Sequence, residues 1–125
     1  MYRWDIRLSS MAGAPWDNVH YDIELIKTAR KAAGDHVELM IDIGKRYRLK
    51  EALYVAKALE QLNIFWLEEP LPAEDYIGYK RLTESTTMRI ATGEEESGRL
   101  AFGRLINETH VDIIQPDMSR CGGLT

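Results

Sequence analysis

From residue 21 onward, the chain alternates short apolar runs of strand length with longer segments in which apolar residues recur every three or four positions. The apolar runs are 37–42, 64–69, 88–92 and 111–115, and the helical segments are 21–33, 49–62, 76–82 and 100–106. Runs that are apolar almost throughout are typical of parallel strands covered on both faces. Four helix–strand units in alternation therefore predict a parallel α/β fold, either a barrel or a doubly wound sheet.

The first 20 residues fit this pattern least. The stretch 2–8 alternates enough to form a strand, and the residues after it, which include Gly13 and Pro15, indicate a loop. We therefore expect a poorly matched N-terminal segment over residues 1–20, made of a strand remnant and a loop, and one α/β domain over residues 21–125.

Composition excludes several classes of protein. The 125 residues include 20 acidic and 16 basic side chains, which give a formal net charge of −4. Mild, scattered acidity is unlike the clustered basic surface of a nucleic-acid-binding protein. No apolar run approaches the roughly 20 residues of a membrane helix, and the N-terminus lacks the apolar core of a signal peptide. We expect a cytoplasmic protein with neither a nucleic-acid nor a membrane partner.

A carboxylate stands at the end of each apolar run or within a few residues of it. These residues are Asp42, Glu68, Glu94 and Asp117, at intervals of 26, 26 and 23 residues (42 to 68, 68 to 94, 94 to 117). Each interval is about one strand–helix unit, and the carboxyl ends of parallel strands lie on one rim, where ligands bind. The sequence therefore predicts four carboxylates on that rim.

A single carboxylate in such a place is more often a helix cap. Four in phase repel one another, and a hard divalent cation such as Mg²⁺, which prefers oxygen ligands, would compensate them. Such an ion would polarise a substrate carboxylate and stabilise the enediolate that forms when the α-proton leaves, while a separate base moves the proton.

Four stretches carry a family resemblance: LMIDIG, FWLEEPLPAEDYIGYKRL, IATGEEESG and VDIIQPDMSRCGGLT. In this order and spacing they resemble the C-terminal barrel of the enolase superfamily, in its mandelate racemase/muconate lactonizing enzyme and acid-sugar dehydratase branch. The resemblance spans residues 21–125. It implies an α/β fold that is a partial TIM (β/α)8 barrel of about four parallel units, corresponding to the third to sixth strands of the family barrel.

The resemblance also implies a site and a reaction. Asp42, Glu68 and Glu94 fall on the family's three Mg²⁺ ligands, and Asp117 falls on the catalytic Asp that, in the racemase-like branch, hydrogen-bonds a proton-transferring His. The implied function is that of a Mg²⁺-dependent racemase, which is an isomerase, or of a dehydratase, which is a lyase. It would abstract the α-proton of a small carboxylate or sugar-acid substrate through a metal-stabilised enediolate.

Several positions depart from the family pattern. Gly44 stands where the family often has Asn, and the Lys-x-Lys motif of the second strand is not visible near the N-terminus. Lys45 and Arg46 either contact an anionic substrate or are solvated charges at a helix start, and the second interpretation is favoured. Glu69 is expected to shape the loop and to support the neighbouring ligands, and Glu95 and Glu96 are expected to be solvated.

Length limits the functional prediction. A complete barrel needs about 250 residues, so we expect the partner His, the other bases and the family's capping domain to be missing. The alternative is a non-catalytic truncated half-barrel that retains metal binding. Because an open half-barrel exposes strand edges and an apolar face, we expect a homo-oligomer. A third, weaker interpretation is an open doubly wound domain that handles phosphate.

Overall fold

The computed structural model describes residues 2–7 and 19–123. Its elements are β1 (Tyr2–Arg7), α1 (Val19–Ala33), β2 (Val37–Asp42), α2 (Leu49–Leu59) with the 3-10 turn η1 (Glu60–Leu62), β3 (Ile64–Glu68), α3 (Tyr76–Ser85), β4 (Ile90–Thr92), α4 (Gly98–Thr109) and β5 (Ile113–Ile114). The four predicted helix–strand units are present, and the predicted N-terminal strand is β1. The loop expected around Gly13 and Pro15 lies outside the described residues.

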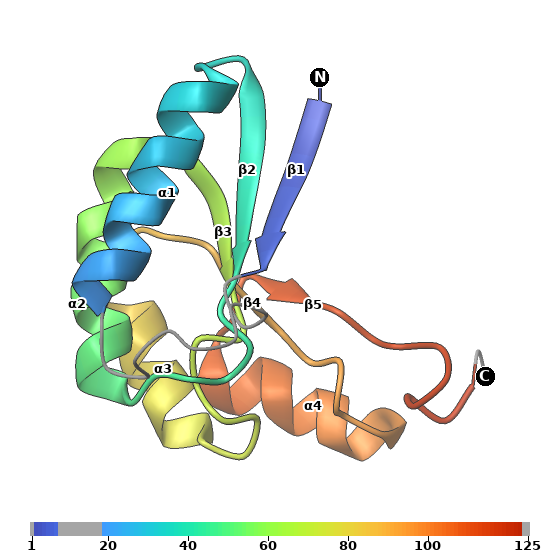
Figure 1. Cartoon of the computed structure of the whole chain (residues 1–125). Coiled ribbons are helices and arrows are strands. Elements are labelled where there is room, and N and C mark those ends of the chain that lie inside the picture. Colours follow the sequence, from blue (N-terminus) through green and yellow to red (C-terminus); the bar gives the residue numbers. More distant parts are fainter. Residues whose placement is uncertain (1, 8–18, 124–125) are drawn as a thin grey trace.

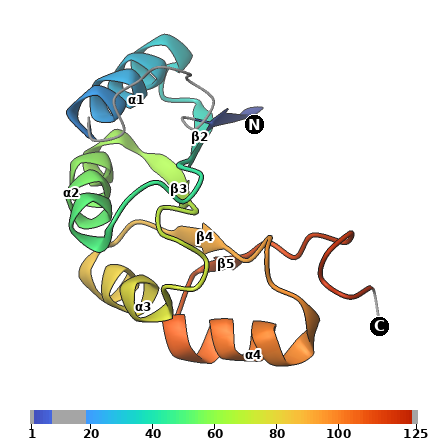
Figure 2. The same cartoon turned by 60° about the horizontal axis from the view of Figure 1, so that its bottom comes forward.

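The five strands form one parallel sheet in the order β1-β2-β3-β4-β5. The helices follow the strands in an arc along one face, and the opposite face has no helix over it among the described residues (Figures 1 and 2). A doubly wound sheet reverses its strand order at a switch point. Strict sequence order with helices on one side is the arrangement of a (β/α)8 barrel, so the fold is a sector of such a barrel, as predicted.

Local backbone chemistry sets the ends of the first two helices. Gly34 follows α1 with φ +71°, and Asn63 follows η1 with φ +49°, so both adopt the left-handed conformation that ends a helix. The helix predicted over 49–62 is one continuous segment whose last turn, η1, tightens to 3-10 geometry.

The last two strands are shorter than predicted. A side chain replaces part of the backbone ladder where they begin: the carboxylate of Asp112 accepts a hydrogen bond from the Ile90 N–H at 2.8 Å, while the Asp112 N–H donates to the Ile90 carbonyl at 3.1 Å. Regular pairing between β4 and β5 therefore starts only at Ala91 and Ile113.

The hydrophobic core lies between the sheet and helices α1 to α3. Its fully buried members include Ile26, Leu39, Ile41, Val55, Leu59, Leu67, Leu82 and Ile90. These residues come from the helix-facing positions of the strands and the inner stripes of the helices. No helix in the described part of the chain is both long and apolar enough to cross a membrane.

Candidate functional site

Strand pairing places the first carboxylates of the rim. Asp42 ends β2, Glu68 ends β3, and the two residues are direct partners in the parallel register, so both side chains lie on the same face of the sheet. Glu68 pairs in turn with Ala91 of β4, and Glu94 follows that strand after a turn at Gly93, whose φ of +122° requires glycine. Asp42, Glu68 and Glu94 thus follow one another along the rim.

Asp42 and Glu68 are also held locally. The buried Asp42 accepts a hydrogen bond from the Gly44 N–H at 2.8 Å, and Glu68 Oε2 accepts one from Trp66 Nε1 at 3.0 Å. Oxygen donors of this kind suit Mg²⁺. Within residues 2–7 and 19–123, however, no three His, Cys, Asp or Glu side chains are already grouped as a metal site. The rim supplies the right donor atoms, but its side chains would have to move to form a cage.

A lysine ammonium group lies among the carboxylates of the rim. Lys45 Nζ is 2.6 Å from Glu95 Oε1, 3.1 Å from Glu69 Oε2 and 3.3 Å from Glu94 Oε1, and the side chain is only 22% exposed. Burial by itself lowers the pKa of Lys45, but the ion pairs with Glu95 and Glu69 outweigh it and raise that pKa above its ordinary value. The favoured expectation of a solvated Lys45 was therefore wrong.

The backbone holds Lys45 against Glu69. Both residues adopt left-handed conformations, with φ values of +65° and +43°, which are uncommon for side chains other than glycine. The Lys45 N–H donates to the Glu69 carbonyl at 2.6 Å, beside the contact between their side chains. Two contacts between the same residues compensate the strain of this loop.

Glu69 is the most buried acid of the rim. Its side chain is 2% exposed, and its Oε1 atom has no hydrogen-bond partner in the described part of the chain. Burial raises the pKa of Glu69 well above its ordinary value, although Lys45 opposes this effect. The sequence analysis expected Glu69 to shape the loop and to support the neighbouring ligands, but it did not identify Lys45 as its partner. The sequence feature that could have indicated its partner is a second acid directly after a buried strand, because a buried carboxylate needs a nearby cation.

Arg46 is likewise not solvated. Its side chain is 10% exposed and lies 3.5 Å from Asp22 of α1, and its Nε donates to the Ile43 carbonyl at 3.1 Å. The Tyr47 hydroxyl donates to the same Asp22 carboxylate at 2.6 Å. Burial and this hydrogen bond raise the pKa of Tyr47. Together these contacts anchor the loop to α1, and this loop also carries Lys45.

Asp117 is positioned differently from the other three carboxylates. It accepts hydrogen bonds from the backbone N–H and the hydroxyl of Ser119, at 2.8 and 2.7 Å, and lies 3.7 Å from Arg120. The bonds from Ser119 lower the pKa of Asp117. A local turn after β5, rather than the strand ladder, therefore orients this side chain.

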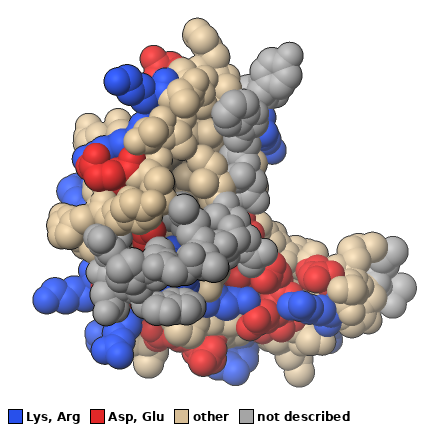
Figure 3. Space-filling model, viewed as in Figure 1, with Lys and Arg blue, Asp and Glu red and all other residues tan. Residues whose placement is uncertain are grey.

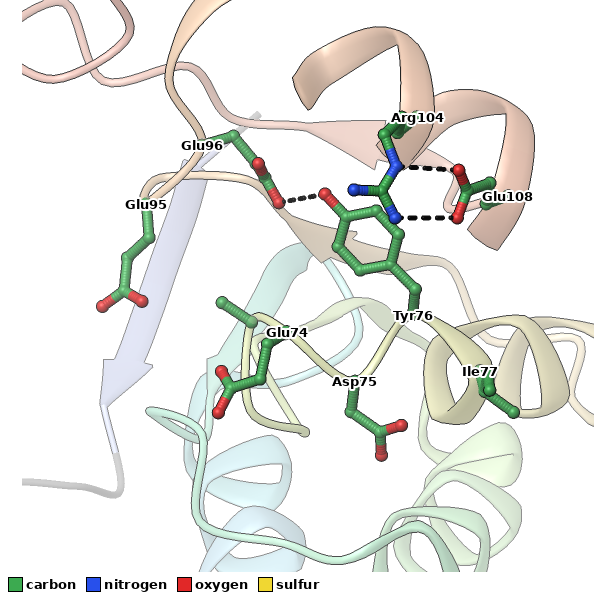
Figure 4. Close-up of a pocket in the computed structure, with 9 residues that line it drawn as sticks. Glu74, Asp75, Tyr76, Ile77, Glu95, Glu96, Arg104 and Glu108 are labelled. Atoms are coloured by element: carbon green, nitrogen blue, oxygen red, sulfur yellow. Dashed lines mark hydrogen bonds and ion pairs between the residues drawn. The ribbon is translucent and has the colours of Figure 1, made fainter. Parts of the chain in front are cut away.

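A groove of about 630 Å³ lies beside the rim, between the start of α3 and α4 (Figure 4). The Tyr76 hydroxyl donates to Glu96 at 2.6 Å, and Arg104 stacks over the Tyr76 ring and pairs with Glu108 at 2.9 Å. Burial and the bond to Glu96 raise the pKa of Tyr76 to about 12. Acidic and basic side chains intermix over this part of the surface (Figure 3). Glu96, expected to be solvated, thus links the rim to α3.

Comparisons with known proteins agree with this architecture. The family model described as "Enolase C-terminal domain-like" matches residues 7–125. The L-talarate/galactarate dehydratase of Salmonella typhimurium is 34% identical over 108 residues, which cover 86% of this chain and 27% of that protein. The chain spans about a quarter of the length of the curated relatives it matches.

Two solved structures match nearly the whole chain. The 3,6-anhydro-D-galactonate cycloisomerase of Zobellia galactanivorans superposes with a TM-score of 0.87 at 37% identity, covering 98% of this chain and 33% of that one. The L-talarate dehydratase of Polaromonas sp. JS666, solved with Mg and L-glucarate, gives 0.84 at 31% identity, with 98% and 32% covered. The barrel sector, its strand-end carboxylates and these matches establish that the chain belongs to the mandelate racemase/muconate lactonizing enzyme C-terminal domain family of the enolase superfamily.

Proposed function

We propose that the rim binds Mg²⁺ through Asp42, Glu68 and Glu94, in a protein that abstracts the α-proton of a small carboxylate of the sugar-acid class. The observation that carries this proposal is the placement of three carboxylates at the ends of consecutive parallel strands, two of them in direct register. A relative solved with Mg and L-glucarate supports the choice of metal and substrate class.

The chain's own residues prepare this site. Asp42 and Glu68 are oriented by the Gly44 N–H and the Trp66 indole, so little side-chain freedom is lost when they engage a cation. The Glu94 side chain is more exposed, at 37%, so it can reorient toward the ion more readily than the other two ligands. A bound divalent cation would stabilise the negative charge that develops on the substrate's carboxylate when the α-proton leaves.

Asp117 is proposed as the acidic member of a proton-transferring pair. The bonds from Ser119 favour its ionised form, and an ionised carboxylate can accept the N–H of an imidazole and stabilise that ring when it is protonated. Asp117 therefore positions a base rather than moving the substrate proton itself.

Calorimetric titration with Mg²⁺ tests the site. The protein should bind Mg²⁺, and Glu68→Gln should weaken binding by at least roughly tenfold, because one of three charged ligands is lost. Glu74→Gln removes the same charge from an exposed residue lining the groove and serves as the matched control. Absence of Mg²⁺ binding by the unmodified protein would contradict the proposal.

The chemistry is tested separately, by exchange of the α-proton of a panel of sugar acids into D₂O, followed by NMR. Exchange that depends on Mg²⁺ would support a catalytic role for the chain by itself. Saturation with Mg²⁺ without exchange would instead support the alternative, a non-catalytic half-barrel that retains metal binding.

One observation favours self-association of such a half-barrel. Its last strand, β5, is an outer strand of the described sheet, and Ile114 on it and Met118 just after it are 39% and 62% exposed. Unpaired strand edges next to exposed apolar side chains favour pairing with a second copy. Light scattering should therefore report a homo-oligomer, and a monodisperse monomer would contradict this second proposal.

A further inference from the structure

Lys45 shares one of its partners with the proposed metal site. Its ammonium contacts Glu69, Glu94 and Glu95, and the contact with Glu94 is the longest of the three, at 3.3 Å. Glu94 is also the proposed ligand that follows β4. A carboxylate oxygen in contact with an ammonium group must leave it, or share it, before it can coordinate a dication.

The position of this positive charge is constrained. The left-handed backbone of Lys45, its N–H bond to the Glu69 carbonyl and its ion pair with the buried Glu69 carboxylate hold the side chain at the rim. Glu95 adds the shortest contact, at 2.6 Å. Lys45 can therefore lose its contact with Glu94 and keep its contacts with Glu69 and Glu95. If it left the rim, the buried Glu69 carboxylate would lose the cation that compensates its charge.

We propose that Lys45 is a built-in competitor of the metal ion for Glu94. In the metal-free protein its ammonium neutralises the carboxylates of the rim, and a divalent cation binds by drawing Glu94 from Lys45 toward Asp42 and Glu68. This inference rests on the proposed metal site, and it explains why the rim has suitable donors but no preformed group of three ligands among the described residues. It also assigns a role to the buried pair of Lys45 and Glu69.

The experiment compares Mg²⁺ affinity by calorimetry in two matched pairs of variants. Lys45→Met should bind Mg²⁺ roughly tenfold more tightly, because both the competitor and a repelling charge are removed. Lys50→Met removes an equal charge from an exposed position of α2 and should change affinity much less.

The second pair leaves Lys45 in place, and so remains informative if Lys45→Met does not fold. Glu95→Gln removes the shortest contact of Lys45 and leaves its ammonium to Glu94 and Glu69, so Mg²⁺ binding should weaken. Glu96→Gln makes the same change in net charge one residue away, at a carboxylate that bonds Tyr76 instead. Glu95→Gln should therefore weaken binding several-fold more than Glu96→Gln.

The outcomes separate this inference from the proposed function. If the unmodified protein binds Mg²⁺ and Lys45→Met binds equally or more weakly, or if Glu95→Gln matches Glu96→Gln, competition by Lys45 is overturned and the metal site stands. If the unmodified protein does not bind Mg²⁺, the proposed metal site fails and the inference fails with it.

Discussion

The helix-covered face of the sheet and the rim at the carboxyl ends of its strands are organised by opposite physical demands. Leu67 and Glu68 are neighbours in β3, yet Leu67 is fully buried under the helices and Glu68 faces the rim side beside Asp42. The helix-covered face is apolar and closely packed. The rim gathers like charges, two left-handed non-glycine residues and a buried acid, one oxygen of which has no hydrogen-bond partner among the described residues. This difference indicates that the helix-covered face supplies stability, whereas the strained backbone and clustered charges of the rim cost stability, as is typical of functional sites.

The largest expected effect breaks the helix-covered face. Leu67→Ala should lower the free energy of unfolding by about 2–5 kcal/mol, because it removes buried methyl groups and leaves a cavity. Its neighbour Glu68→Gln should change that free energy by less than about 1 kcal/mol, since glutamine keeps an oxygen acceptor for Trp66. Urea denaturation measures both. Equal losses of unfolding free energy in the two variants would contradict the division of roles between the helix-covered face and the rim.

A smaller effect is expected where the rim loop joins the core. Tyr47→Phe removes the hydroxyl that donates to the buried Asp22 carboxylate and should cost about 1–3 kcal/mol in the free energy of unfolding. The control is Tyr54→Phe, at a side chain 49% exposed whose hydroxyl lies 3.4 Å from His20. That control should change stability by less than about 0.5 kcal/mol. If Tyr47→Phe lowered the free energy of unfolding as little as the control does, the hydrogen bond from Tyr47 to Asp22 would not anchor the loop.

The smallest effect concerns a carboxylate whose charge favours the fold. Hydrogen bonds from Lys57, the Thr87 N–H and Thr86 lower the pKa of Glu60 to about 2, so its ionised form is favoured in the folded state. Its contribution to stability is present above an unfolded pKa of about 4.5 and is lost as the pH falls toward 2.

This contribution can be isolated from the rest of the acid denaturation. Glu60→Gln should destabilise the protein at pH 7 and make its stability depend less on pH between about 4.5 and 2. Urea midpoints measured across this range give the comparison. Parallel pH profiles for the two proteins would contradict a depressed pKa at Glu60.

Much of the fold was predictable because its signals are local. Apolar runs and helical periodicity placed the four helix–strand units, and Gly34 and Asn63 end helices where expected. The spacing of acids at strand ends predicted that Asp42 and Glu68 lie on one rim, and in the structure the two residues are direct partners in the parallel register. The choice between a barrel and a doubly wound sheet needed the family resemblance, because strand order is not written in periodicity.

The partners of the rim's cations could not be predicted in the same way. Lys45 and Glu94 are 49 residues apart in the sequence, and Arg46 and Asp22 are 24 apart, so no local pattern relates them. Both cations therefore resembled solvated charges at a helix start. The burial of Glu69 and the hydrogen bond from Tyr76 to Glu96 were not predicted for the same reason. Both depend on loops that the sheet brings together.

The sequence by itself determined which elements form and which residue types end each strand, because backbone periodicity and strand direction act over a few residues. Only the tertiary structure decided how the resulting charges are compensated. Parallel pairing brings three loops to one rim, and there Lys45 becomes the counter-ion of Glu69, Glu94 and Glu95. Electrostatic interactions depend on distance in space and on burial, and neither quantity can be read along the chain.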